Sequence, residues 1–291
     1  MVPSSLAQPV PVVKVSRHSR GFTQFKMLAL VLELSRFTLV LCLRFPRLQP
    51  EQKLTEIQRW ASKVLQILQV EVRMEGAPPP PGASLVVANH VSWLDILVLQ
   101  SLLPGVFVAK AEVRRWPLIG TMAQHCSTIF VDRRSRTSAR GMVDGALKAF
   151  DQGYAVIAFP EGTSTDGTGL NPFHANVFEG AISAQIAVLP VAMRYMDAQT
   201  GLPCQAAPFT GEMSLAFSLR KVMAKSTIQV RVHIGDAIPA KGQTRKSVSV
   251  QAHLQIRTRL ESFNRTNAQQ LDAQHPSSSL GAEPDSNSSG I

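Results

Sequence analysis

A histidine and an aspartate five positions apart form a pair that can do acid–base chemistry. His90 and Asp95 belong to the segment NHVSWLD, which directly follows the apolar run SLVVA. On a continuous helix these side chains would be about 140° apart, so they can meet only if a turn intervenes. We expect a strand ending at Ala88, a turn, and a helix that opens near Ser92 with Ser92 as its N-cap.

Such a pair suits the activation of an alcohol. An imidazole can take the proton of a hydroxyl as it attacks a thioester, and a carboxylate can fix the tautomer of the imidazole and stabilise the cation that forms. The alternative is structural: Ser92 and Asp95, three apart, also fit a helix capping box, with His90 as a polar turn residue.

A second polar group follows another apolar strand. The segment FPEGTST at 159–165 comes after YAVIAF and places Glu161, Gly162 and Thr163 at the end of that strand. Ligands of α/β proteins usually bind at the carboxyl ends of strands, and a glycine lets backbone amides approach an anion or a developing oxyanion. A surface turn with a helix cap would leave the same pattern.

Two basic segments lie between these groups. KAEVRRWPLIG begins at Lys110, and FVDRR contains Arg133; both follow or end an expected strand. Their cations could line the same cleft and hold a phosphate or a carrier group. Solvated surface charge is the alternative, and it is the better interpretation for Arg115, Arg134 and Arg136.

The order of elements predicts an α/β fold with a mixed, largely parallel sheet flanked by helices. Strands are expected at 84–88, 106–109, 128–131, 154–159, 187–193 and 227–234, and helices at 92–103, 137–151 and 175–185. This catalytic domain would span 71–263. The Ser-, Asn- and Gln-rich stretch 264–291 is expected to be a disordered tail.

The N-terminal part predicts a membrane-docking module. Residues 1–26 form a basic flexible arm, and residues 27–70 hold two helices. The apolar run 27–43 is nearly long enough to span a bilayer, but Glu33 and Arg36 interrupt it, so an interfacial helix fits better. A buried core helix remains an alternative, whereas a secretory signal is disfavoured because no small-residue cleavage site follows.

Composition narrows the function classes. The formal net charge of +10 suits nucleic acid, anionic lipid or an acidic carrier, but the chain lacks a recognition helix dense in basic residues and any zinc-finger or RNP motif, so nucleic acid is disfavoured. The three cysteines form no CxxC pair, which fits a reducing compartment and predicts neither a disulfide framework nor a zinc site. A serine hydrolase is disfavoured because Asp166 replaces the last glycine of GxSxG.

Five short sequence motifs together resemble those of a known enzyme family. NHVSWLD, KAEVRRWPLIG, TIFVDR, FPEGTST and VLPVAM occur in the order and rough spacing of the glycerolipid acyltransferase motifs, across residues 84–195. The chain resembles the 1-acylglycerol-3-phosphate acyltransferase family. The resemblance implies that His90 is the general base and Asp95 orients it, in a direct attack without a metal or other cofactor. It further implies that Arg133 and the 161–163 segment contact the acceptor, with Lys110 along the cleft.

The same resemblance implies an acyl donor, either acyl carrier protein or coenzyme A, a lysolipid acceptor, and a place on the cytoplasmic face of the inner membrane. One position departs from the family pattern: Ser164 stands where an arginine usually follows EGT and helps to bind the acceptor phosphate. A hydroxyl holds a phosphate less firmly than a guanidinium. The segments FPEGTSTDG and PFHANVFEGA resemble the lyso-ornithine lipid O-acyltransferase branch, whose acceptor has no phosphate. The non-catalytic alternative is a lipid-binding membrane protein.

Overall fold

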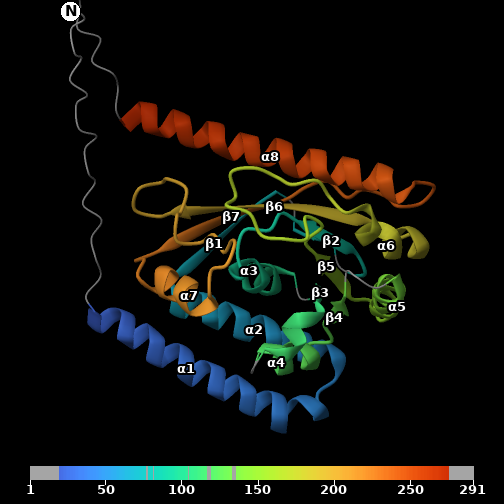
Figure 1. Ribbon diagram of the computed structural model, residues 1–291, viewed down its shortest axis with the longest axis horizontal. Coiled ribbons are helices and arrows are strands. Elements are labelled where there is room, and N and C mark those ends of the chain that lie inside the picture. Colours follow the sequence, from blue (N-terminus) through green and yellow to red (C-terminus); the bar gives the residue numbers. More distant parts are fainter. Residues whose placement is uncertain are drawn as a thin grey trace, which may run out of the picture.

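The computed structural model describes residues 20–76, 78–80, 82–103, 105–116, 119–132 and 136–274. In this part of the chain one seven-stranded sheet forms the centre, with the strand order β1-β7-β6-β2-β5-β3-β4 (Figure 1). The strands are β1 (Val70–Glu75), β2 (Leu85–Ala88), β3 (Gly105–Lys110), β4 (Ile129–Val131), β5 (Ala155–Ala158), β6 (Val188–Asp197) and β7 (Ile228–Ile234).

The sheet is mixed and largely parallel, as the order of elements predicted. Strand β2 pairs in parallel with both β5 and β6, β3 pairs in parallel with β5 and β4, and β1 pairs in parallel with β7. The antiparallel pair is β6 with β7. Because β2, β3, β5 and β6 run in the same direction, their carboxyl ends lie along one edge, where polar groups from distant parts of the chain can meet.

Helices cover both faces of the sheet. Side chains of β2 alternate between the two layers: Val86 packs with the core that includes α2, α3 and α7, whereas Leu85 and Val87 pack with the core that includes α5 and α6. Ala192 of β6 packs against α8. These helices are α2 (Pro50–Leu68), α3 (Leu94–Leu102), α5 (Arg136–Asp151), α6 (Glu179–Ala184), α7 (Leu215–Met223) and α8 (Arg245–Gln274).

Two helices precede the sheet, as predicted, but the first begins earlier than expected. Helix α1 runs Arg20–Leu43, so residues 20–26 are helical rather than part of a flexible arm. The reason is tertiary: Lys26 is buried, and its Nζ donates to the carbonyl of Lys225 at 2.9 Å, just past the end of α7. A cation at a helix C-terminus is favourable. The rest of the predicted arm, 1–19, lies outside the described residues.

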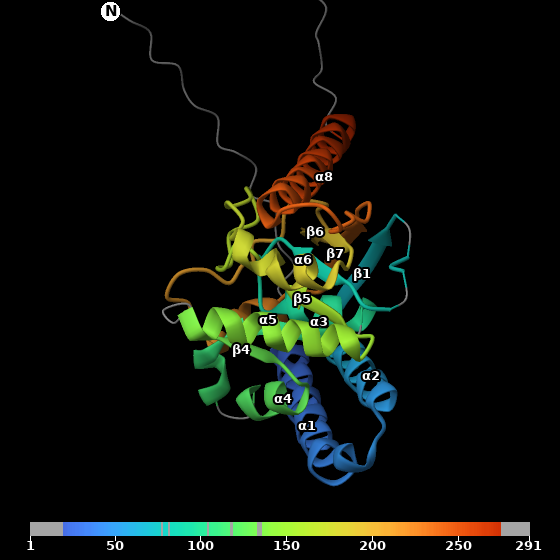
Figure 2. The same ribbon diagram turned by 90° about the vertical axis from the view of Figure 1, so that its right-hand side faces the viewer.

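Helix α1 forms the outermost layer on the α2 side, opposite α8 (Figure 2). Phe37 and Leu41 of α1 pack against Ile57 of α2 and Met122 of α4 (Ile119–His125). Glu33 and Arg36 pair with each other at 2.6 Å. No described helix combines the length and the apolar character that crossing a bilayer requires.

The C-terminal helix also corrects a predicted boundary. Helix α8 continues to Gln274, so the expected tail from 264 begins inside it, and the remainder from 275 lies outside the described residues. At the predicted boundary, Phe263 of α8 is buried, and its ring lies 4.5 Å from the guanidinium of Arg231 and 4.8 Å from that of Arg259. Both arginines bond Glu75 of β1. The predicted elements did not include β1, α4, α7 or α8, and α2 ends at Leu68 rather than 70.

Candidate active site

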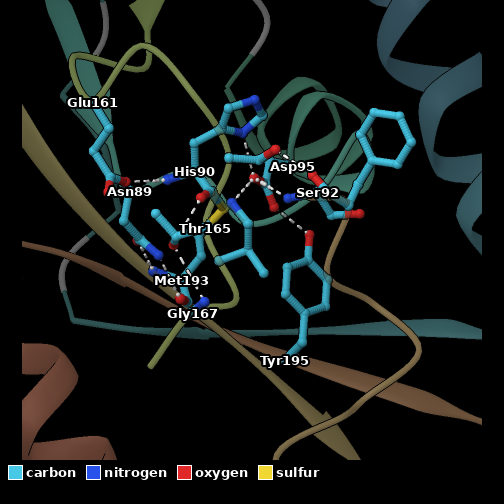
Figure 3. Close-up of polar contacts among 12 residues, drawn as sticks. Asn89, His90, Ser92, Asp95, Glu161, Thr165, Gly167, Met193 and Tyr195 are labelled. Carbon is cyan, nitrogen blue, oxygen red and sulfur yellow. Dashed lines mark hydrogen bonds and ion pairs between the residues drawn. The ribbon is translucent and has the colours of Figure 1, made fainter. Parts of the chain in front are cut away.

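The turn after β2 brings His90 and Asp95 into contact. His90 Nδ1 lies 2.8 Å from Asp95 Oδ2, and α3 opens between them at Leu94 (Figure 3). The Asp95 carboxylate has no exposed surface, whereas the His90 side chain keeps 22% of its surface exposed. One side of the imidazole is therefore held by the protein while the ring remains accessible, which is the arrangement that a general base needs.

Asp95 also organises the backbone of the turn. Its Oδ2 accepts hydrogen bonds from the backbone amides of Val91 at 2.7 Å and Ser92 at 2.9 Å. The carboxylate thus reaches back as in one half of a capping box. Ser92 is not the N-cap that the sequence predicted: the helix is preceded by Trp93, and the buried Ser92 hydroxyl has no hydrogen-bond partner among the described residues.

A third kind of donor reaches Asp95 from β6. The hydroxyl of Tyr195 donates to Asp95 Oδ1 at 2.7 Å, so the carboxylate lies between the His90 ring and the Tyr195 phenol (Figure 3). Burial and the neighbouring Asp95 charge raise the pKa of Tyr195 well above its ordinary value, which keeps the phenol a donor. Sequence analysis missed this residue, because Tyr195 is a hundred positions from Asp95 and no local spacing connects them.

The histidine is fixed from two further directions. Its ring stacks on Phe159, with 4.1 Å between the ring centroids and 15° between the planes. The preceding Asn89 is clamped to β6, since its side chain donates to the carbonyl of Met193 at 3.0 Å and accepts from the amide of Met193 at 2.7 Å. Both Asn89 bonds are buried, so the turn that carries His90 is tied to the middle of the sheet.

Glu161 supports the backbone of His90. Its Oε1 accepts the amide of His90 at 2.7 Å, and its Oε2 accepts the amide of Asn171 at 2.8 Å. Burial raises the pKa of Glu161, and repulsion from Asp95 adds to the rise, whereas the bonds from the two amides oppose it. The carboxylate that the sequence assigned to acceptor binding thus joins the His90 turn to the 160–171 loop.

The same loop crosses the turn that carries His90. Thr165 donates its amide to the carbonyl of His90 at 2.8 Å. Gly162 adopts φ +74°, in the left-handed region that favours glycine, and its amide bonds the carbonyl of Phe159 at 3.0 Å. Thr163 follows with an exposed side chain. The loop therefore places Gly162 and Thr163 next to the turn that carries His90.

The structure places one of the two predicted binding cations, Lys110, and does not describe the other, Arg133. Lys110 ends β3 with an exposed side chain. Strands β3 and β5 are parallel, and Phe107 pairs with Ile157. Three residues further along each strand, this register puts Lys110 level with Pro160. Lys110 is therefore at the same edge of the sheet as Glu161. The structure thus brings Lys110 to the edge that carries His90, two strands away in the sheet. Arg133 lies outside the described residues.

Comparison with known proteins identifies the family. A family model described as Acyltransferase matches residues 69–194. The lyso-ornithine lipid O-acyltransferase of Pseudomonas aeruginosa is 37% identical over 202 residues, which cover 69% of this chain and 76% of that protein. The chain belongs to the 1-acylglycerol-3-phosphate acyltransferase family. It is an O-acyltransferase.

Other relatives agree with this assignment. The 1-acyl-sn-glycerol-3-phosphate acyltransferase of Neisseria meningitidis serogroup B is 38% identical over 156 residues, which cover 54% of this acyltransferase and 60% of the relative. The crystal structure of the 1-acyl-sn-glycerophosphate (LPA) acyltransferase from Thermotoga maritima superposes with a TM-score of 0.65 at 19% identity, covering 84% of this chain and 95% of that one. At this identity the structural match shows a shared fold.

The Glu161 bridge gives the first testable prediction. In Glu161→Gln an amide NH2 must face one of the two backbone amides, which leaves a buried donor without a partner. We expect kcat/KM to fall by about 10-fold or more, because an unpaired buried donor costs about 1–3 kcal/mol. Steady-state acyl transfer measures the change. Glu212→Gln, an exposed carboxylate before α7, is the matched control, and equal activity of the two variants would contradict the bridge.

Proposed function

We propose that this acyltransferase moves a fatty acyl group from a thioester to the hydroxyl of a lysolipid, with His90 as general base and Asp95 as the residue that orients it. The 2.8 Å contact between His90 Nδ1 and the buried Asp95 carboxylate carries the proposal. An ionised carboxylate only accepts hydrogen bonds, so Nδ1 carries the donated proton and Nε2 is left unprotonated. Nε2 is then the atom that receives the proton of the acceptor hydroxyl.

The reaction has two steps: the acceptor hydroxyl attacks the thioester, and the thiolate leaves. The acceptor oxygen bonds to the thioester carbonyl carbon as its proton passes to Nε2, and the imidazolium that forms is stabilised by Asp95. The C–S bond then breaks, and the thiolate leaves with the proton returned by Nε2. The acyl group passes directly from the thioester to the acceptor, and no covalent acyl-enzyme forms. Stacking on Phe159 and the bonds to the His90 backbone keep the ring in place throughout.

Position 164 supports a lysolipid acceptor without a phosphate. The Ser164 hydroxyl is directed at the carbonyl of Phe209, to which it donates, so it adds no positive charge to the loop. A charge-assisted bond is about twice as strong as a neutral one, so a phosphate monoester loses a strong partner here. Relatives named as lyso-ornithine lipid O-acyltransferases match this chain over 202 and 241 residues. We therefore assign a lyso-ornithine lipid as the preferred acceptor.

We assign the acyl donor only to a chemical class, the acyl thioesters. Acyl carrier protein and coenzyme A both present the acyl group as a thioester on a phosphate-bearing arm, so either fits the reaction. Lys110 is exposed at the edge of the sheet that carries the site, where its ammonium can attract such an arm. Arg133 follows the neighbouring strand β4, and we propose the same kind of role for it, together with acceptor contact.

We propose that α1 docks the protein on a membrane, at the cytoplasmic face. Ser35 and Thr38 donate their hydroxyls to carbonyls of their own helix, and Glu33 pairs with Arg36, so these polar groups are satisfied internally. A helix whose polar groups are satisfied internally and whose outer side chains are apolar can lie in a bilayer interface. The outward apolar side chains of α1 are Phe25, Leu28, Val31, Leu32, Leu39 and Leu43, and Ile119 and Phe217 are exposed on the adjoining α4 and α7.

Removal of the base tests the catalytic assignment. In His90→Ala we expect kcat to fall by about 10²- to 10⁴-fold, the usual contribution of a general base, and Asp95→Asn should give a loss in the same range. Transfer from acyl carrier protein and coenzyme A thioesters is measured with purified protein. His174→Ala, a substitution at an exposed histidine outside the pair, is the control. Unchanged turnover in His90→Ala contradicts the assignment, and turnover in neither protein favours a non-catalytic lipid-binding role.

An acceptor panel tests the role of position 164. With lysophosphatidate and lyso-ornithine lipid offered separately, the wild type should show the higher kcat/KM for the acceptor without phosphate. Ser164→Arg should raise the relative use of lysophosphatidate by about 10-fold, since a bond to a charged group contributes about 1.5–3 kcal/mol. Thr168→Arg adds the same charge to an exposed position of the same loop and should not. A strict requirement of the wild type for lysophosphatidate would refute the assignment.

Introduction of negative charge on α1 tests docking. Leu28 and Leu32 are one turn apart and are 57% and 61% exposed, so Leu28→Glu with Leu32→Glu places two carboxylates on the outer surface. Binding to vesicles of phosphatidylethanolamine and phosphatidylglycerol, followed by co-sedimentation, should fall by at least about 10-fold. Val250→Glu with Leu254→Glu, at 59% and 53% exposure on α8, is the matched pair. Equal losses in the two double variants would show that α1 is not the docking surface.

A further inference from the structure

The buried Asp95 carboxylate divides its hydrogen bonds unequally between its two oxygens. Oδ2 accepts from the His90 ring and from the amides of Val91 and Ser92. Among the described residues, the partner of Oδ1 is the hydroxyl of Tyr195 at 2.7 Å. A buried carboxylate is stable as an anion only when its oxygens are hydrogen-bonded. The charge on Asp95 therefore depends on Tyr195 for one of its two oxygens.

Tyr195 is held where it can supply that bond. It belongs to β6, whose partner β2 leads into the turn that carries His90. Ala88 of β2 pairs with Val191 of β6, two residues before His90 and four residues before Tyr195. Its ring packs in the core with α2, α3 and α7, and its backbone carbonyl accepts the amide of Cys204 at 3.0 Å. The phenol is anchored in the sheet rather than in a loop, so its distance to Asp95 is fixed by strand pairing.

We propose that Tyr195 is a positioning residue for catalysis, which holds Asp95 ionised and aimed at His90 and so sets the strength of the base. The proposal rests on the proposed function of His90 and Asp95. The phenol does not touch the substrates; it acts through the carboxylate. The arrangement forms a relay from β6 to the reacting atom: Tyr195 donates to Asp95, Asp95 accepts from Nδ1 of His90, and Nε2 takes the acceptor proton.

Removal of the phenol hydroxyl should move the pH–rate profile in one definite direction. Without the bond to Oδ1, the buried Asp95 anion is less stable and less firmly aimed, so it supports the His90 imidazolium less well. The acid limb of the rate profile then moves to lower pH, because the less stabilised imidazolium gives up its proton more readily, and His90 becomes a weaker base. The other titratable groups that face this pair are Glu161 from the loop after β5 and Cys204 beside Tyr195. Both remain in place when the hydroxyl alone is removed.

Tyr195→Phe tests the proposal with a built-in control. The chain has two tyrosines, and Tyr154 lies at the amino end of β5, the end of that strand opposite the site. Full-length wild type, Tyr195→Phe, Tyr154→Phe and His90→Ala are compared by kcat, KM and pH profile. We expect Tyr195→Phe to lose about 10-fold in kcat, with little change in KM for the acyl donor or for the acceptor, and to shift the acid limb to lower pH. Tyr154→Phe should match the wild type in all three.

A second readout does not depend on turnover. The ¹⁵N chemical shifts of the His90 ring report its tautomer and protonation, and they should change in Tyr195→Phe but not in Tyr154→Phe. If Tyr195→Phe matches the wild type in pH profile and ring shifts, or loses only thermal stability, the positioning role is overturned. If His90→Ala retains turnover, the proposed function fails instead, and the ring shifts still decide whether Tyr195 controls the pair.

Discussion

A buried negative charge is the constraint on which the rest of the site depends. Asp95 has no exposed surface, and an ionised carboxylate in that position must be matched by donors. Four converge on it: the ring of His90, the amides of Val91 and Ser92, and the phenol of Tyr195. Three of these come from the turn itself and one from the sheet. Satisfying the charge therefore fixes the turn, the helix start and the histidine at the same time.

The sheet makes this convergence possible. Parallel pairing of β2 with β5 and β6 puts the ends of three strands along one edge, so that each strand contributes a contact to the catalytic turn. Strand β2 leads into His90, β5 leads into Glu161, and β6 supplies Met193 and Tyr195. The proposed chemistry belongs to His90 and Asp95, but the positions of these residues are set by hydrogen bonds to segments 71 to 104 positions away.

The site also connects to the proposed membrane surface. Helix α1 is joined to the end of α7 by Lys26, and α7 holds Trp93 of the catalytic turn through Ser218, at 3.0 Å. Both contacts lie on the face of the sheet that α1, α2, α3 and α7 cover. A lipid acceptor that enters from the surface on which α1 docks would therefore approach the side of the molecule that carries Asp95.

The sequence alone determined the fold class, the positions of most strands and the pairing of His90 with Asp95, because alternating apolar runs and short motifs are local signals. It determined neither the start of α1, where Lys26 bonds the end of α7, nor the packing of α8, whose Phe263 lies against two arginines. Tyr195 likewise came from tertiary structure alone. Strand pairing, not spacing along the chain, decides which distant hydroxyl faces a buried carboxylate.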